Sequence, residues 1–490
     1  MHYDVNPRQP LLEFLTEKEL DEIHYATLEV LERVGANVYH PEARELLYSA
    51  GARIEDDLRV RIPPYLVEKT LQLAPKRVTL ANRLGERTIF LEGAKICFGT
   101  GSDLPNTIDH ETGQRRKSLL KDVENGALVC DYLDNIDFIM CDALPSDIHP
   151  IMQELYEFYA MMKNSVKPMF LTVSSGRRDM LEYMYEMAVA VAGTRENLEA
   201  NPFFAIYEEP SAPLRHAKDC SEVLLFCAEH RIPITYPAVI FSGANAPVTM
   251  AGVVTMANAA TLAGLVIHQL KNPGAPYIYG GGVSTCLDMK YAIMAYGAPE
   301  FRVATTILAQ LSRRYGLSTW NTGGVTDSKT VDEQAAIEGT SSLLMSALGG
   351  GNIIHDVGYL ESGLTGSLTF LVMMDEAIAL VKRILRSSRV DRETLAVDLI
   401  AEVGPDGSFL TKPHTLQHFK QEFWSPRLID RSNYERWVKQ GSLTLQARAQ
   451  AKVRKILSSH QPVPLPEKTL KELERIMHSA ERNVLPRVKG

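Results

Sequence analysis

Residues 317–363 carry a dense group of side chains suited to holding a small molecule. Two apolar stretches end there, one at Trp320 and Asn321 and the next at His355 and Asp356. In parallel α/β folds, the loops that follow the strands form the ligand site. The stretch is therefore expected to supply two neighbouring loops with hydrogen-bonding and carboxylate groups to one site.

Other apolar stretches end in polar or aromatic residues in the same way. The further candidates at such ends are Asp103, Asn106, Tyr207, Glu208, Glu209, Tyr279, Gly281 and Asp327. Ring faces attract quaternary ammonium groups, so the aromatic residues together with Glu208 or Glu209 are consistent with a box around a cation. Aromatic residues also favour strands for packing alone, and that interpretation stays open.

Several common kinds of catalytic site have no signature in this chain. The sequence contains no HEXXH and no Cys/His cluster, so no tightly bound metal is predicted. It also contains no GxSxG and no GxxxxGK[ST]. The glycine runs at 280–282 and 349–351 instead suit close approach of a flat partner.

Eight apolar strands alternate with eight helices in the middle of the chain. The strands are expected at 96–99, 136–142, 168–173, 202–207, 232–240, 276–280, 317–322 and 352–356. The helices are expected at 120–133, 151–164, 178–192, 220–230, 256–270, 300–315, 331–348 and 370–386. Strict alternation predicts a parallel sheet, and eight units predict an α/β fold of the (β/α)8 TIM-barrel type. An open doubly wound sheet is the alternative, but no GxGxxG follows the first strand.

The segments on either side of this central part have other patterns of predicted secondary structure. Residues 1–92 are predicted to form an N-terminal α+β cap, and residues 93–388 the barrel. Residues 389–490 are predicted to be a helical extension with amphipathic helices at 447–459 and 468–480. We expect the extension to pack on the barrel or to mediate contacts in a homo-oligomer.

Composition limits the class of protein. A net charge of −8 argues against a nucleic-acid binder. The six cysteines form no CxxC pair, which favours free thiols in a reducing compartment. The first residues lack a signal-peptide pattern, and no long uninterrupted apolar run predicts a membrane span. The expected location is the cytoplasm.

Four segments resemble the trimethylamine methyltransferase family. They are GTGSDLPNTIDHETGQRR at 99–116, NIDFIMCDALPSD at 135–147, TDSKTVDEQA at 326–335 and NIIHDVGYLESG at 352–363. The resemblance extends over residues 10–480. It implies a (β/α)8 barrel and an enzyme that moves a methyl group from an amine to the Co(I) corrinoid (cobalamin) of a separate partner protein.

The resemblance also bears on the substrate. The trimethylamine enzymes carry pyrrolysine at the barrel mouth, but none of these 490 residues is pyrrolysine. The resemblance places the equivalent position in the 323–329 loop. The chain is therefore similar to the non-pyrrolysine branch, which demethylates quaternary amines such as glycine betaine, proline betaine and carnitine. From this resemblance we expect glycine betaine as the donor, which would give dimethylglycine. A quaternary ammonium leaves as a neutral amine and needs no proton donor, so positioning and desolvation of the cation suffice.

This resemblance suggests roles for the residues at the strand ends. Tyr207, Tyr279, Trp320 and Phe370 are the predicted cation-binding rings, with Glu208 or Glu209 as countercharge. His355, Asn321 and Arg302 are predicted to hold a betaine carboxylate. The predicted corrinoid-facing residues are Asp103, Asn106, Gly281 and Asp327.

Two other functions stay open on the sequence. One is a metal-dependent TIM-barrel hydrolase with His355, Asp356 and Glu361 near the metal. The other is a quaternary-amine binding protein without turnover.

Overall fold

Buried strands from the centre of the chain pair side by side in one parallel sheet. The structure, a computed structural model, describes residues 9–173, 175–281 and 284–488, so Gly282 of the predicted glycine run lies outside the described residues. Within these ranges the strand order is β6-β18-β17-β14-β12-β10-β9. Every neighbouring pair in this order is parallel. The strands are β6 (Cys97–Phe98), β9 (Met169–Thr172), β10 (Phe204–Tyr207), β12 (Ile234–Thr235), β14 (Tyr277–Gly280), β17 (Thr319–Thr322) and β18 (Ile353–His355).

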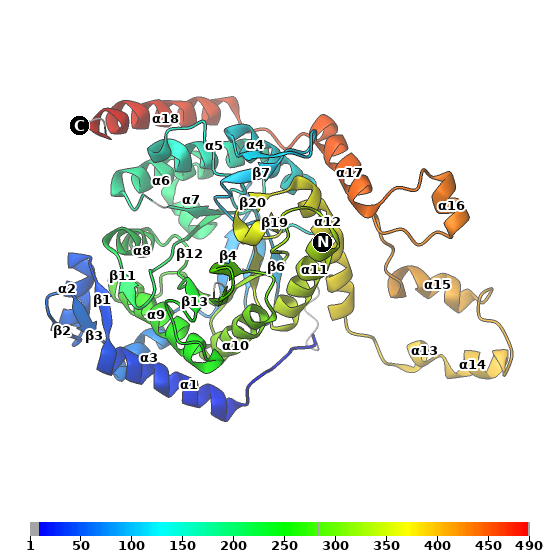
Figure 1. Cartoon of the computed structure of the whole chain (residues 1–490), viewed down its shortest axis with the longest axis horizontal. Coiled ribbons are helices and arrows are strands. Elements are labelled where there is room, and N and C mark those ends of the chain that lie inside the picture. The colour runs from blue at the N-terminus through cyan, green and yellow to red at the C-terminus, as the bar shows by residue number, and fades with distance from the viewer. Residues whose placement is uncertain (1–8, 174, 282–283, 489–490) are drawn as a thin grey trace.

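Helices follow the strands along the chain and cover the outside of the sheet (Figure 1). They are α4 (Leu120–Tyr132), α5 (Gln153–Asn164), α6 (Arg178–Ala192), α8 (Lys218–His230), α9 (Met250–Lys271), α10 (Pro299–Tyr315), α11 (Glu333–Leu348) and α12 (Leu368–Leu385), with the short η2 (Pro150–Met152) and α7 (Arg195–Ala200) in connections. Such crossovers are what parallel strands require. The expected alternating parallel α/β architecture is confirmed, and all strand C-termini lie at one end, which we call the mouth.

The segment 136–142, expected to be a strand, lies between the two edge strands of this sheet. Gly99, directly after β6, forms a parallel bridge with Phe138, and Ile139 forms a parallel bridge with Met169 of β9. The segment therefore contacts both edges through isolated bridges.

The strand expected at 232–240 is divided in two. β12 belongs to the central sheet, whereas β13 (Ile240–Ser242) pairs with β15 (Ser284–Asp288), which also pairs with β16 (Ile293–Ala295). Pro237 lies between the two parts, and proline lacks the backbone N–H that a central strand needs. The chain thus leaves the sheet at Pro237 and forms a small second sheet beyond the mouth.

The N-terminal layer packs against the other end and one side of the sheet. Its elements are α1 (Glu17–Glu29), η1 (Val30–Val34), β1 (Ala36–Val38), α2 (Pro41–Ser49), β2 (Arg53–Glu55), β3 (Arg59–Arg61), α3 (Pro64–Leu73), β4 (Val78–Ala81) and β5 (Arg87–Leu91). β1 also pairs in parallel with β11 (Arg215–His216) from the central part. Leu80 and Leu91 of the β4–β5 hairpin share one hydrophobic cluster with Phe170 and Trp320 of the sheet. The hairpin therefore covers the strand N-termini, which leaves the mouth as the end available to ligands.

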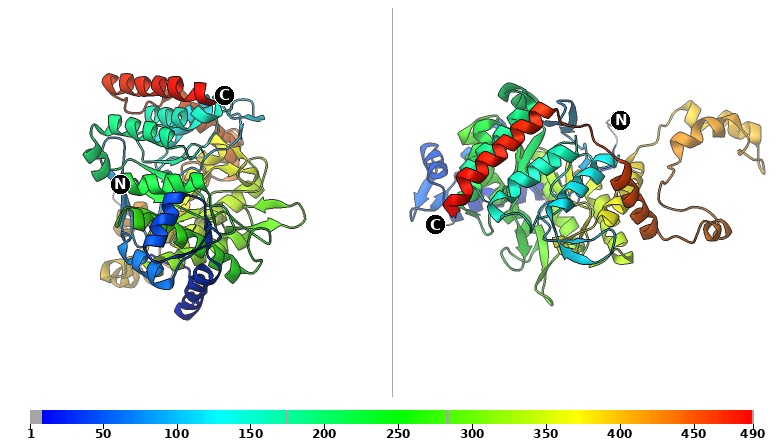
Figure 2. Two further views of the ribbon diagram at one scale, coloured as in Figure 1. Left: turned by 90° about the vertical axis from the view of Figure 1, so that its left-hand side faces the viewer. Right: turned by 90° about the horizontal axis from the view of Figure 1, so that it is seen from above.

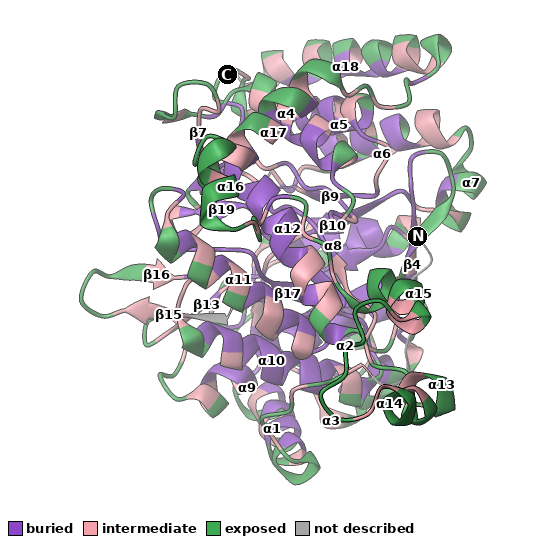
Figure 3. Cartoon of the chain, turned by 90° about the vertical axis from the view of Figure 1, so that its right-hand side faces the viewer, coloured by how far each residue is buried: buried purple, intermediate pink, exposed green. Residues whose placement is uncertain are grey.

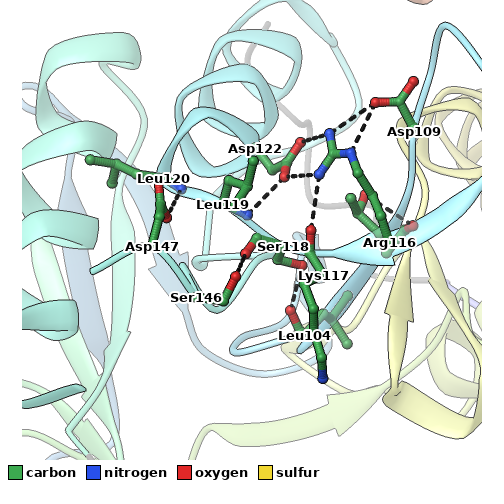
Figure 4. Close-up of polar contacts among 12 residues, drawn as sticks. Leu104, Asp109, Arg116, Lys117, Ser118, Leu119, Leu120, Asp122, Ser146 and Asp147 are labelled. Atoms are coloured by element: carbon green, nitrogen blue, oxygen red, sulfur yellow. Dashed lines mark hydrogen bonds and ion pairs between the residues drawn. The ribbon is translucent and has the colours of Figure 1, made fainter. Parts of the chain in front are cut away.

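Another small sheet extends the rim of the mouth. Its strands are β7 (Asn106–Ile108), β8 (Arg115–Lys117), β19 (Tyr359–Leu360) and β20 (Thr365–Gly366), with η3 (Glu361–Gly363) between the last two. Arg116 donates to Asp122 at the start of α4 at 2.6 and 2.9 Å and to Asp109 at 3.0 Å (Figure 4). Two charge-assisted contacts of this kind fix the loop that carries the 99–116 segment.

The C-terminal extension has two parts. Its helices α17 (Leu445–Ser459) and α18 (Glu467–Val488) pack on the central fold, α17 against α12 and α4 and α18 against α6 and α5. Residues 388–443, which we call the arm, project away from the body for much of their length (Figures 1 and 2), and they return to it where the backbone of Arg427, Leu428 and Ile429 donates to Glu376 of α12. The arm contains α13 (Arg392–Leu395), α14 (Val397–Val403), α15 (Pro413–Glu422) and α16 (Tyr434–Lys439).

Among the residues that the structure describes, one helix is long and apolar enough to cross a membrane. This helix is α9, of 22 residues. It packs against α1, α2, α3, α8 and α10, and most of its residues are buried. A helix that is apolar all round is expected at the centre of a large fold, and α9 occupies that place here.

Candidate active site

Strand pairing determines which side chains face the inside of the sheet. Trp320 is paired with Ile353, and Thr322 with His355. Tyr207 is paired with Thr235 of β12. Directly paired residues in a parallel sheet share a face, and alternate residues of one strand point to opposite faces. Trp320, Tyr207 and Ile353 belong to the inner hydrophobic cluster, so Thr322, His355 and Thr235 face inward as well.

Five rings meet on this inner face, and we call them the aromatic cluster: Phe138, Phe170, Tyr207, Trp320 and His355. The Trp320 ring centroid lies 4.4 Å from that of His355, 4.8 Å from Phe170 and 5.2 Å from Tyr207. Tyr207 and His355 are 5.8 Å apart. The structure therefore brings together Tyr207, Trp320 and His355, three of the residues selected from the sequence.

Carboxyl groups lie at the mouth side of the aromatic cluster. The Tyr207 hydroxyl donates a hydrogen bond to Glu209. The pKa of Glu209 is raised from 4.5 to about 7, mainly by burial; the bond from Tyr207 opposes the rise, and the charges of Asp356 and Asp103 contribute to it. Burial also raises the pKa of Asp103 to about 6. The mouth thus holds carboxyl groups whose surroundings contain too little positive charge to offset the effect of burial on their pKa.

His355 is held between two neighbours. Its Nε2 lies 3.0 Å from the Thr322 hydroxyl, and its Nδ1 lies 2.6 Å from Asp356 Oδ1. Asp356 is buried and has a positive φ of 70°. A Cβ on Gly101 would lie 2.0 Å from Asp356 Oδ1, so a glycine is required where this carboxylate approaches the first loop.

Arg302 lies behind the end of β17. Its guanidinium donates to the backbone oxygen of Thr322 at 2.7 Å and to that of Tyr296 at 2.9 Å. Burial lowers its pKa to about 10, and the nearby Asp356 and Asp327 act in the opposite direction. The guanidinium is therefore already used to join two loops and is partly balanced by carboxylates.

The structure separates the other predicted substrate residues from the aromatic cluster. Tyr279 faces outward and donates to Asn258 of α9 at 2.7 Å. Asn321 also faces outward, toward Gly351. Phe370 is buried between α12 and Gly339 of α11.

Glu208 also lies on the outer side of the sheet. It follows inward-facing Tyr207, and the charges of Glu209, Glu154 and Asp219 of α8 raise its pKa beyond the increase caused by burial. Its Oε2 is buried and accepts no hydrogen bond from any residue that the structure describes. Of the two adjacent glutamates, Glu209 is therefore the one beside the rings.

The predicted corrinoid-facing residues have contacts within the loops of the mouth. Asn106 donates to Leu364 O at 3.0 Å. Asp327 accepts from the backbone of Tyr296 at 2.8 Å and from Gly297 at 2.9 Å. Gly281 is buried against β17 and α10, where an added Cβ would lie 3.0 Å from Thr319 Oγ1. Asn106 and Asp327 thus hold the rim together. Of the four predicted residues, Asp103 is the one whose charge acts on Glu209.

Some residues of the site were not selected from the sequence. Phe138 and Phe170 complete the ring cluster, and Thr235 and Thr322 line the same face. Successive side chains of a strand point to opposite faces, which could have placed these residues. That inference requires the register of the strand, which the sequence alone does not show. Asp356 was named at a strand end and for a metal site, but it was not predicted as a carboxylate beside the rings.

The residues of the hydrolase alternative do not converge. Glu361 accepts from Arg115 at 2.8 Å and from the Thr365 hydroxyl at 2.5 Å, while His355 pairs with Asp356. Among the residues that the structure describes, no group of three or more His, Cys, Asp or Glu side chains is arranged to hold a metal ion.

A cavity of about 280 Å³ lies far from this cluster. It is lined by residues of the β4–β5 turn, including Asn82 and Arg83, and by residues near α7, including Asn197. It therefore belongs to the covered end of the sheet.

The chain is similar to known proteins over nearly its whole length. The family model described as trimethylamine methyltransferase (MTTB) matches residues 2–484. A trimethylamine methyltransferase MttB of Desulfitobacterium hafniense is 35% identical over 467 residues, which cover 95% of this chain and 93% of that protein. A glycine betaine methyltransferase of the same species is 32% identical over 458 residues, covering 93% and 94%.

A solved structure is similar in fold. The monomethylamine methyltransferase MtmB of Methanosarcina barkeri aligns over 97% of this chain and 89% of its own, with a TM-score of 0.51 and 9% identity. At this identity the likeness concerns the fold alone.

Proposed function

Because the chain belongs to the trimethylamine methyltransferase family, we propose that it transfers a methyl group from a quaternary amine to the reduced corrinoid of a separate protein. The family membership supports methyl transfer from a methylated amine. The absence of pyrrolysine from the 490 residues supports a quaternary amine, whose methyl transfer requires no special electrophile.

The observation that carries this proposal is the aromatic cluster with Glu209 and Asp356 beside it. Tyr207 and Trp320 lie 5.2 Å apart between ring centroids, with their planes tilted by 37°, and Trp is the strongest of the aromatic cation binders. A carboxylate adjacent to such faces adds a direct charge attraction that is strong in a buried site. This combination suits a cation that cannot donate hydrogen bonds.

The reaction balances without any protein acid or base. The carbon–nitrogen bond breaks, its electron pair stays on nitrogen, and the amine leaves neutral. The corrinoid supplies the electron pair for the new cobalt–carbon bond, and its Co(I) is thereby oxidised to Co(III). The protein's contribution is to hold one N-methyl group at the mouth, in line with the acceptor, and to remove water from the cation.

We also infer that the sheet closes into an eight-stranded barrel, with residues 136–142 as its eighth strand. The bridges from Gly99 to Phe138 and from Ile139 to Met169 support this inference. A closed barrel covered by the β4–β5 hairpin would leave the mouth as the docking face for the corrinoid protein. Asn106 and Asp327 hold the loops of that face in place.

The proposed reaction is tested by mixing the protein with reduced cobalamin or a reduced corrinoid protein and following the absorbance of Co(I). The donors are choline, tetramethylammonium, glycine betaine, carnitine and trimethylamine. Loss of the Co(I) signal with any quaternary amine would support the proposal. Binding of a quaternary amine without methyl transfer, in the presence of a competent corrinoid protein, would contradict it and favour a binding protein.

Tyr279 offers a prediction that separates structural from catalytic rings. Tyr279→Phe removes the hydroxyl that donates to buried Asn258 Oδ1. We expect the free energy of unfolding to fall by about 1–2 kcal/mol, because Asn258 loses a buried partner. Urea denaturation measures this loss, and kcat/KM for the methyl donor should stay within about twofold. A loss of kcat/KM with unchanged stability would return Tyr279 to the site.

We propose that the protein forms a homo-oligomer in which the exposed apolar residues of the arm pack against a second copy of the chain. In the described part of the arm, α13, α14, α15 and α16 contain no buried residue, and Leu416 and Phe423 are 73% and 69% exposed. Isolated helices this short are marginal in water, so they need a surface to pack on. In Figure 3, α13, α14 and α15 lie on the side opposite β15 and β16, so this surface would not obstruct the mouth.

A charge placed on the arm is expected to disrupt that packing. Leu416→Glu combined with Phe423→Glu should lower the mass measured by light scattering to that of a smaller assembly. The control is Ile337→Glu on α11, where the apolar residue is 69% exposed. An unchanged mass in both variants would show that the arm does not hold the assembly together.

A further inference from the structure

We infer that the methyl donor is a quaternary ammonium cation of net charge +1 that bears no carboxylate, a class that includes choline and tetramethylammonium. This inference rests on the proposed function and specifies the substrate of the same site. It excludes glycine betaine and its relatives as preferred donors, because these are zwitterions with an anionic end.

The residues predicted to bind a carboxylate do not form a carboxylate site. Asn321 lies on the outer face of β17, away from the aromatic cluster. His355 Nδ1 is 2.6 Å from Asp356 Oδ1, so an anion approaching this nitrogen would meet the Asp356 carboxylate. Both hydrogen bonds of Arg302 described above go to backbone oxygens at the ends of two loops.

The charges around the rings have the opposite sign to the one a betaine requires. Glu209 and Asp356 lie against Tyr207 and His355, and Asp103 adds a third carboxyl group to the same side. Arg302 is the buried cation near them, and Asp356 and Asp327 already face it. A carboxylate on the substrate would be repelled by these groups, whereas a simple cation would be attracted.

Neutral polar atoms on the inner face, Trp320 Nε1 and Thr235 Oγ1 among them, lack a hydrogen-bond partner within the described part of the chain. Trp320 Nε1 and Thr235 Oγ1 are fully buried and form no hydrogen bond. Both belong to inward-facing residues, as the strand pairing shows. Buried polar atoms normally have partners, so a neutral oxygen of the ligand or an ordered water is expected there. A hydroxyl such as that of choline suits an indole donor and a threonine hydroxyl.

The class of donor is tested by measuring kcat/KM for choline, tetramethylammonium and glycine betaine with the same reduced corrinoid acceptor. We expect choline and tetramethylammonium each to exceed glycine betaine by at least tenfold. A preference for glycine betaine would overturn this inference and leave the methyl-transfer function intact. Transfer from none of the donors would instead overturn the proposed function.

Variants supply a second readout. Glu209→Gln removes one repelling charge, so it should lower kcat/KM for choline more than that for glycine betaine and shift their ratio by at least tenfold. Glu208→Gln is the matched control, because Glu208 lies on the outer side of the same strand end. An unchanged ratio in Glu209→Gln would contradict the role of charge in selecting the donor.

Binding can also be observed without turnover. Trp320 is the buried tryptophan of the inner face, whereas Trp424 and Trp437 lie in the partly exposed arm. Choline is expected to quench tryptophan fluorescence at lower concentration than glycine betaine, and Trp320→Phe should remove this signal. Equal or tighter quenching by glycine betaine would contradict the inference.

Discussion

Glu209→Gln is expected to lower kcat/KM for a quaternary amine by about 100-fold, which corresponds to about 2.7 kcal/mol of lost transition-state stabilisation. The carboxylate accepts a bond from Tyr207 and lies beside the aromatic cluster, so its charge acts on the bound cation at close range. Glutamine keeps the shape and the hydrogen bond but removes the charge. Steady-state kinetics of Glu209→Gln beside Glu208→Gln measures the effect, and comparable losses in both would contradict it.

The same variant should change the dependence on pH. The pKa of Glu209 is raised from 4.5 to about 7 in the folded protein, mainly by burial, with Asp356 and Asp103 adding to the rise and Tyr207 opposing it. A raised carboxyl pKa means that the folded state holds a proton that the unfolded state loses. The contribution of Glu209 to the stability of the wild type is therefore lost as the pH rises from about 4.5 through about 7. Glu209→Gln should melt above the wild type at pH 8, and the difference should vanish at pH 4.

Activity should follow the ionised form of Glu209. For the wild type, kcat/KM is expected to rise with pH through about 7, because this ratio reports groups of the free enzyme. The rise should be absent in Glu209→Gln. A wild-type profile that is flat from pH 6 to pH 8 would contradict the assignment of Glu209 as the countercharge.

Trp320→Ala is expected to have the largest effect on stability. The side chain is fully buried and contacts Phe138, Phe170, Tyr207 and His355. Its removal should cost about 3–5 kcal/mol in the free energy of unfolding, because the inner face cannot collapse around the space. It should also abolish methyl transfer.

Trp320→Phe separates the two roles of this ring. It keeps an aromatic side chain, so most of the stability should remain, but the weaker ring face should lower kcat/KM by about tenfold. The control is Trp437→Phe in the arm, where the indole donates to Leu443 O at 3.1 Å. If Trp320→Phe behaves like this control in the kinetic assay, Trp320 is a packing residue alone.

The order of the elements could be derived from the sequence because hydrophobic periodicity and turn residues are local signals. The helix expected at 178–192 has these bounds as α6, and the strand expected at 317–322 begins two residues later as β17. The strand expected at 232–240 was too long, although Pro237 was the local sign of its break. Residues 389–490 were predicted to be helical, but the individual short helices of the arm were not delimited, because no buried stripe marks them.

The sequence did not reveal which residues of each strand face the inside of the sheet and which face the helices. Strands of a parallel sheet are buried on both sides, so their sequences lack the alternation that reveals a core face. Tyr279 and Trp320 both lie at strand ends, yet one contacts Asn258 of α9 and the other the aromatic cluster. Register with the neighbouring strands decides between them, and register depends on the whole sheet.

The most direct test of the central claim follows the methyl group itself. A quaternary amine with 13C-labelled N-methyl groups is incubated with the protein and a reduced corrinoid acceptor, and both products are identified by NMR and mass spectrometry. The account predicts one labelled methyl on the corrinoid for each molecule of tertiary amine released, with choline as a better donor than glycine betaine. Formation of the amine without label on the corrinoid, or label from trimethylamine alone, would contradict it.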